Sequence, residues 1–201
     1  AERAVCAHLA ALARSGGIVP TRLHLWWSSE AFVTTTDPSR NSLATLAVLG
    51  GALTLPPSNI HAMPSSNGSA DPDDAAYAYA KELDGTVFDI CLLEIGRGGR
   101  VASISPRHPS FTAQSGTSQL ATGVTDAPEG PAEQVTLTYK AINRSRQVWG
   151  LACGAERAGC LAATLGGDPR TPAARVHGAE RTVWFVDRAA ASTVPYFQCD
   201  L

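Results

Sequence analysis

The segment FDICLLEIGRGGRVASISPRHP, from Phe88 to Pro109, determines the fold and the site that we expect from this sequence. It opens with an apolar run, residues 88–93, whose composition is typical of a buried β-strand. Three glycines follow in four positions, Gly96, Gly98 and Gly99, and backbone amides in such a turn can point at an anion. Ligands of open α/β sheets bind beyond the carboxyl ends of strands. We therefore expect a ligand at this turn, the alternative being a tight turn that binds nothing.

Around this segment, strand patterns alternate with helix patterns along the whole chain. Apolar or alternating runs predict strands at residues 23–27, 88–93, 134–139, 148–153 and 182–186, and helical spacing predicts helices at residues 1–14, 41–50, 71–83 and 154–165. The stretch after Pro109, up to Pro131, is rich in Gly, Ser and Thr and is expected to be an irregular surface loop. Such alternation favours one α/β domain, residues 1–201, with a parallel sheet covered by helices on both faces.

The overall composition excludes several classes of function. The 201 residues carry a net charge of −2, and Lys and Arg do not gather in clusters of more than two neighbours, so neither a nucleic-acid face nor a basic membrane patch is expected. No apolar run is long enough to cross a membrane. The cysteines match neither a zinc pattern nor a CxxC motif, which predicts a reduced, cytoplasmic protein without a bound metal; they are Cys6, Cys91, Cys153, Cys160 and Cys199.

A second strand end adds polar side chains to the expected site. The strand at residues 23–27 runs into Ser28-Ser29-Glu30. Glu30 and Glu94 would lie at neighbouring strand ends, where they could form an acid/base pair of carboxylates. The alternative is that each is solvated or forms an ion pair with Arg97 or Arg100.

The segment FDICLLEIGRGGRVASISPRHPSF also resembles the corresponding strand and loop of the 6-phosphogluconolactonase family, in register from Phe88 to Pro109. The resemblance continues in order along the chain, through LHLWWSSEAFV, DPSRN, IHAMP, VTLTYKAINRSRQVWGLACGAERA and TVWFVDRAAAS. It covers nearly all of the sequence. It implies a Rossmann-like three-layer α/β/α domain with a mostly parallel sheet, of the kind shared with glucosamine-6-phosphate isomerases.

The resemblance also implies a reaction. Members of the family hydrolyse 6-phosphoglucono-lactone to 6-phosphogluconate without a metal or a cofactor, so the implied partner is a phosphorylated sugar lactone or sugar acid. A lactone is an activated ester, and a positioned base near neutral pKa is sufficient to hydrolyse it.

When the family pattern is transferred residue by residue, several of its charged and catalytic positions carry different side chains in this sequence. Arg100 stands at the position of the water-activating His, Gly98 stands at the acidic position of the loop, and only Glu30 remains of the charged residues at the second strand end. Because a guanidinium stays protonated, Arg100 cannot take a proton from water. The expected substrate- or phosphate-binding residues are Gly96, Gly99, Ser103, Arg40, Asn41, Arg157 and His108.

These substitutions leave two functions open. One is the lactonase reaction with rearranged machinery. The other is a catalytically inactive relative that binds a sugar phosphate through Arg97, Arg100 and Arg107, or that serves as a regulatory or partner subunit. For His108, the alternative to a base is a residue that starts a helix or turn, and His24 and His61 are expected to be structural.

In the family, the helix that opens this sequence follows an N-terminal strand–helix–strand unit with a Thr-Gly-Gly phosphate loop. The resemblance therefore leaves two alternatives: the sequence is truncated ahead of this helix, or the sheet lacks these strands. A sheet without them would have an exposed edge, and we expect a homo- or hetero-oligomer to cover it.

Overall fold

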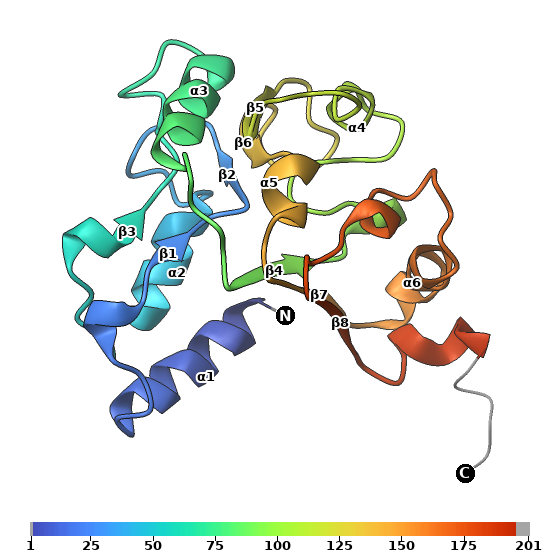
Figure 1. The fold of residues 1–201 in the computed structure, drawn as a ribbon, viewed down its shortest axis with the longest axis horizontal. Coiled ribbons are helices and arrows are strands. Elements are labelled where there is room, and N and C mark those ends of the chain that lie inside the picture. The colour runs from blue at the N-terminus through green and yellow to red at the C-terminus, as the bar shows by residue number, and fades with distance from the viewer. Residues whose placement is uncertain (1, 196–201) are drawn as a thin grey trace.

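The computed structural model of the protein describes residues 2–195, and helices alternate with strands along the chain (Figure 1). The helices are α1 (Glu2–Arg14), α2 (Asn41–Leu49), α3 (Pro72–Glu82), α4 (Pro109–Thr112), α5 (Tyr139–Asn143) and α6 (Ala158–Leu165). The strands are β1 (Leu25–Trp26), β2 (Ser29–Ala31), β3 (Ile60–His61), β4 (Ile90–Glu94), β5 (Ala121–Val124), β6 (Gln134–Leu137), β7 (Gln147–Ala152) and β8 (Arg181–Val186). Cys199, one of the five cysteines of the sequence, lies outside the described residues.

The strands form an α/β fold in which parallel pairing predominates. β7 lies between β4 and β8 and pairs parallel with both, with Leu92 opposite Trp149 and Trp149 opposite Val183. β1 pairs parallel with β3. In Figure 1, α1, α2 and α3 lie on the side of β1 and β3, and α6 lies beside β8.

The single parallel sheet that the sequence predicted is divided into three parts, and one part is antiparallel. β6 pairs antiparallel with β2 and with β5. β5 falls inside the stretch that was predicted to be an irregular loop, which is a correction to that prediction. Residues 125–133 connect β5 to β6 directly, and a short connection of this kind joins antiparallel strands, whereas parallel strands need a longer crossover.

The apolar core is divided into two clusters. The larger one surrounds β4 to β7 and α3, and it includes Tyr79, Leu93 and Ile142, whose side chains are fully buried. The hydroxyl of Tyr79 donates to Trp27 O at 3.0 Å and accepts from Trp27 N at 3.0 Å, which fixes the end of β1 to α3. The smaller cluster lies between α1 and α2 and is built around Ala10 and Leu49.

An Asp side chain accepts a backbone amide at the start of two helices. Asp71 Oδ1 accepts the Asp74 amide at 2.8 Å, with Pro72 in the first turn of α3. Asp187 Oδ1 accepts the Ala190 amide at 2.7 Å, where a short 3-10 helix begins. Among the described residues, no helix is long and apolar enough to span a membrane.

Candidate active site around Arg100

The glycine turn lies directly beyond the carboxyl end of β4, where the sequence placed it. Its glycines are required by the backbone and by packing: Gly98 and Gly99 have φ values of +59° and +82°, and a Cβ on Gly99 would lie 2.2 Å from Thr171 Cγ2. The Gly96 amide donates to Arg100 O at 2.8 Å, and the Gly99 amide donates to Gly96 O at 3.2 Å. These two amides therefore hold the turn together, and their proposed contact with phosphate stays a prediction.

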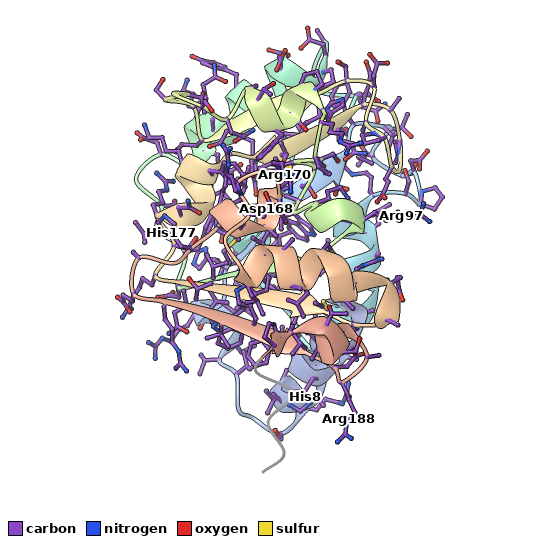
Figure 2. The ribbon with its side chains drawn as sticks, turned by 90° about the vertical axis from the view of Figure 1, so that its right-hand side faces the viewer. His8, Arg97, Asp168, Arg170, His177 and Arg188 are labelled. Carbon is purple, nitrogen blue, oxygen red and sulfur yellow. The ribbon has the colours of Figure 1, made fainter. Side chains whose placement is uncertain are left out.

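Arg100 forms an ion pair with a residue that the sequence did not single out. Its Nε lies 3.2 Å from Glu129 Oε2, and its Nη1 donates to Ala102 O. Arg97 Nε lies 3.7 Å from the other oxygen of Glu129, but the Arg97 side chain is 85% exposed and projects from the edge of the molecule (Figure 2). The carboxylate of Glu129 thus lies between two guanidinium groups, and the better-placed partner is Arg100.

Glu30 has a structural role that the sequence did not predict, while its acid/base pairing with Glu94 stays a prediction. It is 1% exposed, and its carboxylate accepts the amides of Ala31 at 3.0 Å, Asn41 at 2.6 Å and Ser42 at 2.9 Å. The last two amides are in the first turn of α2, so Glu30 caps this helix from outside it. Its ion-pair partner is Arg40, at 3.7 Å, and neither Arg97 nor Arg100.

Arg40, which was expected to bind substrate, is buried beside Glu30. Its Nη2 donates to Met63 O at 2.6 Å and its Nη1 to Ala31 O at 3.5 Å. The Arg40 guanidinium is therefore used to tie the start of α2 to the segment after β3.

A cavity of about 310 Å³ opens beside the Arg100–Glu129 pair. Its polar lining includes Ser29, Glu30, Asn41, Arg100, Ser103, Glu129 and Gln134. Gln134 holds the loop that carries Glu129, since its Nε2 donates to Glu129 O at 2.7 Å and to Pro131 O at 2.8 Å. Its Oε1 accepts from the hydroxyl of Ser103. The glycine turn, the end of β2 and this loop are thereby joined around one cavity.

Other expected site residues divide into two groups. Arg157 is anchored by a hydrogen bond from its Nε to Ile95 O at 2.9 Å, and it faces a second, adjoining cavity that also contacts Gly96 and Arg100. His108 does not line either cavity: its Nδ1 accepts the Ser110 amide at 3.1 Å at the start of α4, as the helix-start alternative predicted. Gly98 and Arg40 also line neither of the two cavities.

His24 and His61 form a ring stack with Trp26. His61 lies parallel to Trp26, with ring centroids 3.8 Å apart, and its Nδ1 is 2.6 Å from Glu82 Oε1. His24 Nδ1 lies 3.1 Å from His61 Nε2. These contacts confirm the structural role expected for both. Within residues 2–195, no group of three or more His, Cys, Asp or Glu side chains is arranged to hold a metal ion.

Parallel strands between helices, with polar side chains gathered at the carboxyl end of β4, define an α/β protein whose candidate site lies where ligands of such sheets bind. The family model of glucosamine-6-phosphate isomerases and 6-phosphogluconolactonases matches residues 2–184, and the chain belongs to this family.

Curated relatives and solved structures agree with this assignment. The chain is 38% identical over 204 residues to the 6-phosphogluconolactonase of Streptomyces coelicolor, covering 93% of this chain and 77% of the relative. It is 35% identical over 187 residues to that of Mycobacterium leprae, covering 87% of this chain and 74% of the relative. The crystal structure of 6-phosphogluconolactonase from Thermotoga maritima superposes with a TM-score of 0.77 at 29% identity, over 92% of this chain and 79% of that one.

Proposed function

We propose that this protein hydrolyses a phosphorylated sugar lactone, 6-phosphoglucono-lactone, to the sugar acid in the cavity beside Arg100. The observation that carries the proposal is the Arg100–Glu129 pair, which places a permanent cation and a proton acceptor on the wall of one cavity. The similarity to lactonases of Streptomyces and Mycobacterium supports the choice of substrate.

The two side chains have complementary roles in this reaction. Water attacks the lactone carbonyl carbon, the carbonyl oxygen gains negative charge, and the ring oxygen leaves with a proton. Arg100 cannot accept a proton, but its guanidinium can stabilise the oxyanion, an effect that contributes about 10²–10³-fold in other enzymes. Glu129, 33% exposed at the cavity, accepts the proton of the attacking water.

The polar side chains around the pair position the substrate. Asn41 is fixed by donation from its Nδ2 to Ser29 O at 2.9 Å, and it lines the cavity together with Ser103. Arg157 supplies positive charge from the adjoining cavity, where its Nε is held by Ile95 O. A phosphoryl group between Arg157 and Arg100 would be bound by charge-assisted hydrogen bonds.

A second function is favoured by Arg100 itself. A cation at the position where the family has its His would bind a sugar phosphate even if the water were never activated. The protein would then bind 6-phosphogluconate without turnover.

One pair of measurements separates the two functions. Hydrolysis of the lactone is followed at neutral pH by proton release, with and without the protein, and binding of 6-phosphogluconate is measured by calorimetry. Hydrolysis above the buffer rate supports the enzyme. Binding without hydrolysis supports the second function, and neither binding nor hydrolysis excludes both. Arg100→His, which restores a base, is the informative variant, because it should raise the rate only if the wild-type chain lacks one.

A further inference from the structure

Gly96, at the start of the turn after β4, has a backbone conformation that does not require glycine. Its φ is −85°, which most residues adopt without strain, whereas Gly98 and Gly99 have positive φ values. The Gly96 amide donates to Arg100 O at 2.8 Å, so this donor is already used within the turn. Whatever requires a glycine at this position is therefore found in the space that a side chain would occupy.

The space beside Gly96 is filled by the guanidinium of Arg100. A Cβ added to Gly96 would lie 2.8 Å from Arg100 Nε, 3.0 Å from Nη2 and 3.1 Å from Cζ, and these are the three heavy atoms nearest to it. Non-bonded carbon atoms pack at about 3.5–4.0 Å, so a side chain at position 96 and the guanidinium in its present place exclude each other. Arg100 thus folds back over the turn, with its carbonyl and its guanidinium both against Gly96.

Two hydrogen bonds hold the Arg100 guanidinium in this place. Its Nη1 donates to Ala102 O, and its Nε donates to Glu129 Oε2 at 3.2 Å. Ala102 has a φ of +50°, which is uncommon for a residue with a side chain, so the backbone that presents this carbonyl is itself constrained. Within residues 2–195, Nη2 makes no hydrogen bond, and Arg100 lines both cavities. Nη2 is therefore the donor that remains for a ligand.

We propose that Gly96 is a positioning residue of this site: because it has no side chain, it seats the Arg100 guanidinium over the turn, and it acts on the reaction through Arg100. A guanidinium whose place is fixed before the substrate binds stabilises an oxyanion without having to reorganise. A larger residue at position 96 would keep Arg100 in the chain but move its charge, so its effect would resemble the removal of Arg100. The catalytic consequence rests on the proposed function, whereas the position of the guanidinium does not.

A double-mutant cycle on thermal unfolding tests the position of the guanidinium. Gly96→Ala is made in the wild-type chain and in Arg100→Ala, and the matched control in both is Gly51→Ala, where a new Cβ has no heavy atom within 4 Å. Gly96→Ala should lower Tm by about 2–4 °C when Arg100 is present and should leave it unchanged within about 1 °C in Arg100→Ala. Gly51→Ala should have the same effect in both chains. Should Gly96→Ala not fold, folding restored by Arg100→Ala supports the proposal. Equal effects of Gly96→Ala in the two chains, including failure of both to fold, would overturn it.

The initial rate of 6-phosphoglucono-lactone hydrolysis by the same chains tests the role in catalysis. Gly96→Ala should lower kcat by about 10-fold when Arg100 is present and should cause no further loss in Arg100→Ala, because no guanidinium is then left to position. A residue that only supports the fold would lower kcat equally in both chains. That result, or an unchanged kcat in Gly96→Ala, would overturn the positioning role. If the wild-type chain does not hydrolyse the lactone, the proposed function fails, and the Tm cycle alone decides whether Gly96 seats Arg100.

Discussion

The guanidinium of Arg100 and the carboxylate of Glu129 lie 3.2 Å apart, although 29 residues separate them in the sequence. This contact joins the turn after β4 to the loop between β5 and β6. The two side chains are 30% and 33% exposed, so the pair is accessible from the cavity. The site therefore combines a strand-end turn, which the sequence predicted, with a loop residue that it did not.

Replacing the carboxylate that caps α2 should destabilise the protein. Glu30→Gln loses the charge that accepts three amides and leaves the Arg40 guanidinium buried without an anion. We expect a loss of about 3 kcal/mol in the free energy of unfolding, measured with urea. Adding Arg40→Met should recover part of this loss, because the unpaired charge is then removed. A loss below about 1 kcal/mol would contradict the capping role.

The glycine turn should be intolerant of a side chain at one position in particular. Gly99→Ala combines a positive φ with a clash against Thr171, whereas Gly85→Ala, at a φ of +73°, has no heavy atom within 4 Å of the new Cβ. Gly85→Ala should cost about 1 kcal/mol and Gly99→Ala at least about 3 kcal/mol in thermal unfolding. Thr171→Ser, which removes the clashing methyl group, should recover part of the larger loss. Equal costs at the two glycines would show that the turn is not packed as described.

The cysteines should react with thiol reagents at very different rates. Burial raises the pKa of Cys91 from 9.0 to about 12, with a hydrogen bond from Ser145 acting in the opposite direction. Cys153 is exposed. At pH 8, native protein should therefore be labelled at Cys153 at least about 100-fold faster than at Cys91, because the thiolate is the reactive form. Peptide mass spectrometry gives the two rates, and equal labelling in the native state would contradict the burial of Cys91.

Asp168 should contribute to stability in a defined range of pH. Its side-chain hydrogen bond with Arg170 lowers the pKa of the carboxyl group from 3.8 to about 2, with further help from the Arg170 amide. A carboxyl group with a lowered folded-state pKa stabilises the protein above its ordinary pKa, and the contribution is lost as the pH falls through the folded-state value. The stability difference between wild type and Asp168→Asn should be constant above pH 5 and should disappear between about pH 4 and 2. A difference that does not change over this range would contradict the assignment.

The sequence predicted the parts of the fold that are dominated by local apolar pattern. β4, β7 and β8 follow from short apolar runs, and α3 follows from Asp71 and Pro72 at its start. β5 was missed because Ala-Thr-Gly-Val lies in a stretch rich in Gly, Ser and Thr, and its strand conformation depends on pairing with β6.

The sequence predicted where the candidate site lies, but it did not predict which side chains contact one another there. Three glycines after an apolar strand indicated the turn at Arg100, and this inference needs only neighbouring residues. Glu129 comes from a loop whose position depends on hydrogen bonds from Gln134, so no local pattern distinguishes it from Glu133. For Glu30, burial against the first turn of α2 decided the role, and burial of a charged residue is a property of the tertiary structure.

The central claim is that the Arg100–Glu129 pair carries lactone hydrolysis, and Glu129→Gln tests it most directly. A matched control is available in Glu180→Gln, which alters an exposed Arg–Glu pair near the start of β8, where Arg146 Nε lies 2.8 Å from Glu180 Oε1. Initial rates of 6-phosphoglucono-lactone hydrolysis are measured for wild type and both variants, with the uncatalysed rate subtracted. We predict that Glu129→Gln lowers kcat by about 100-fold and that Glu180→Gln leaves it unchanged. A Glu129→Gln enzyme as active as wild type would contradict the account.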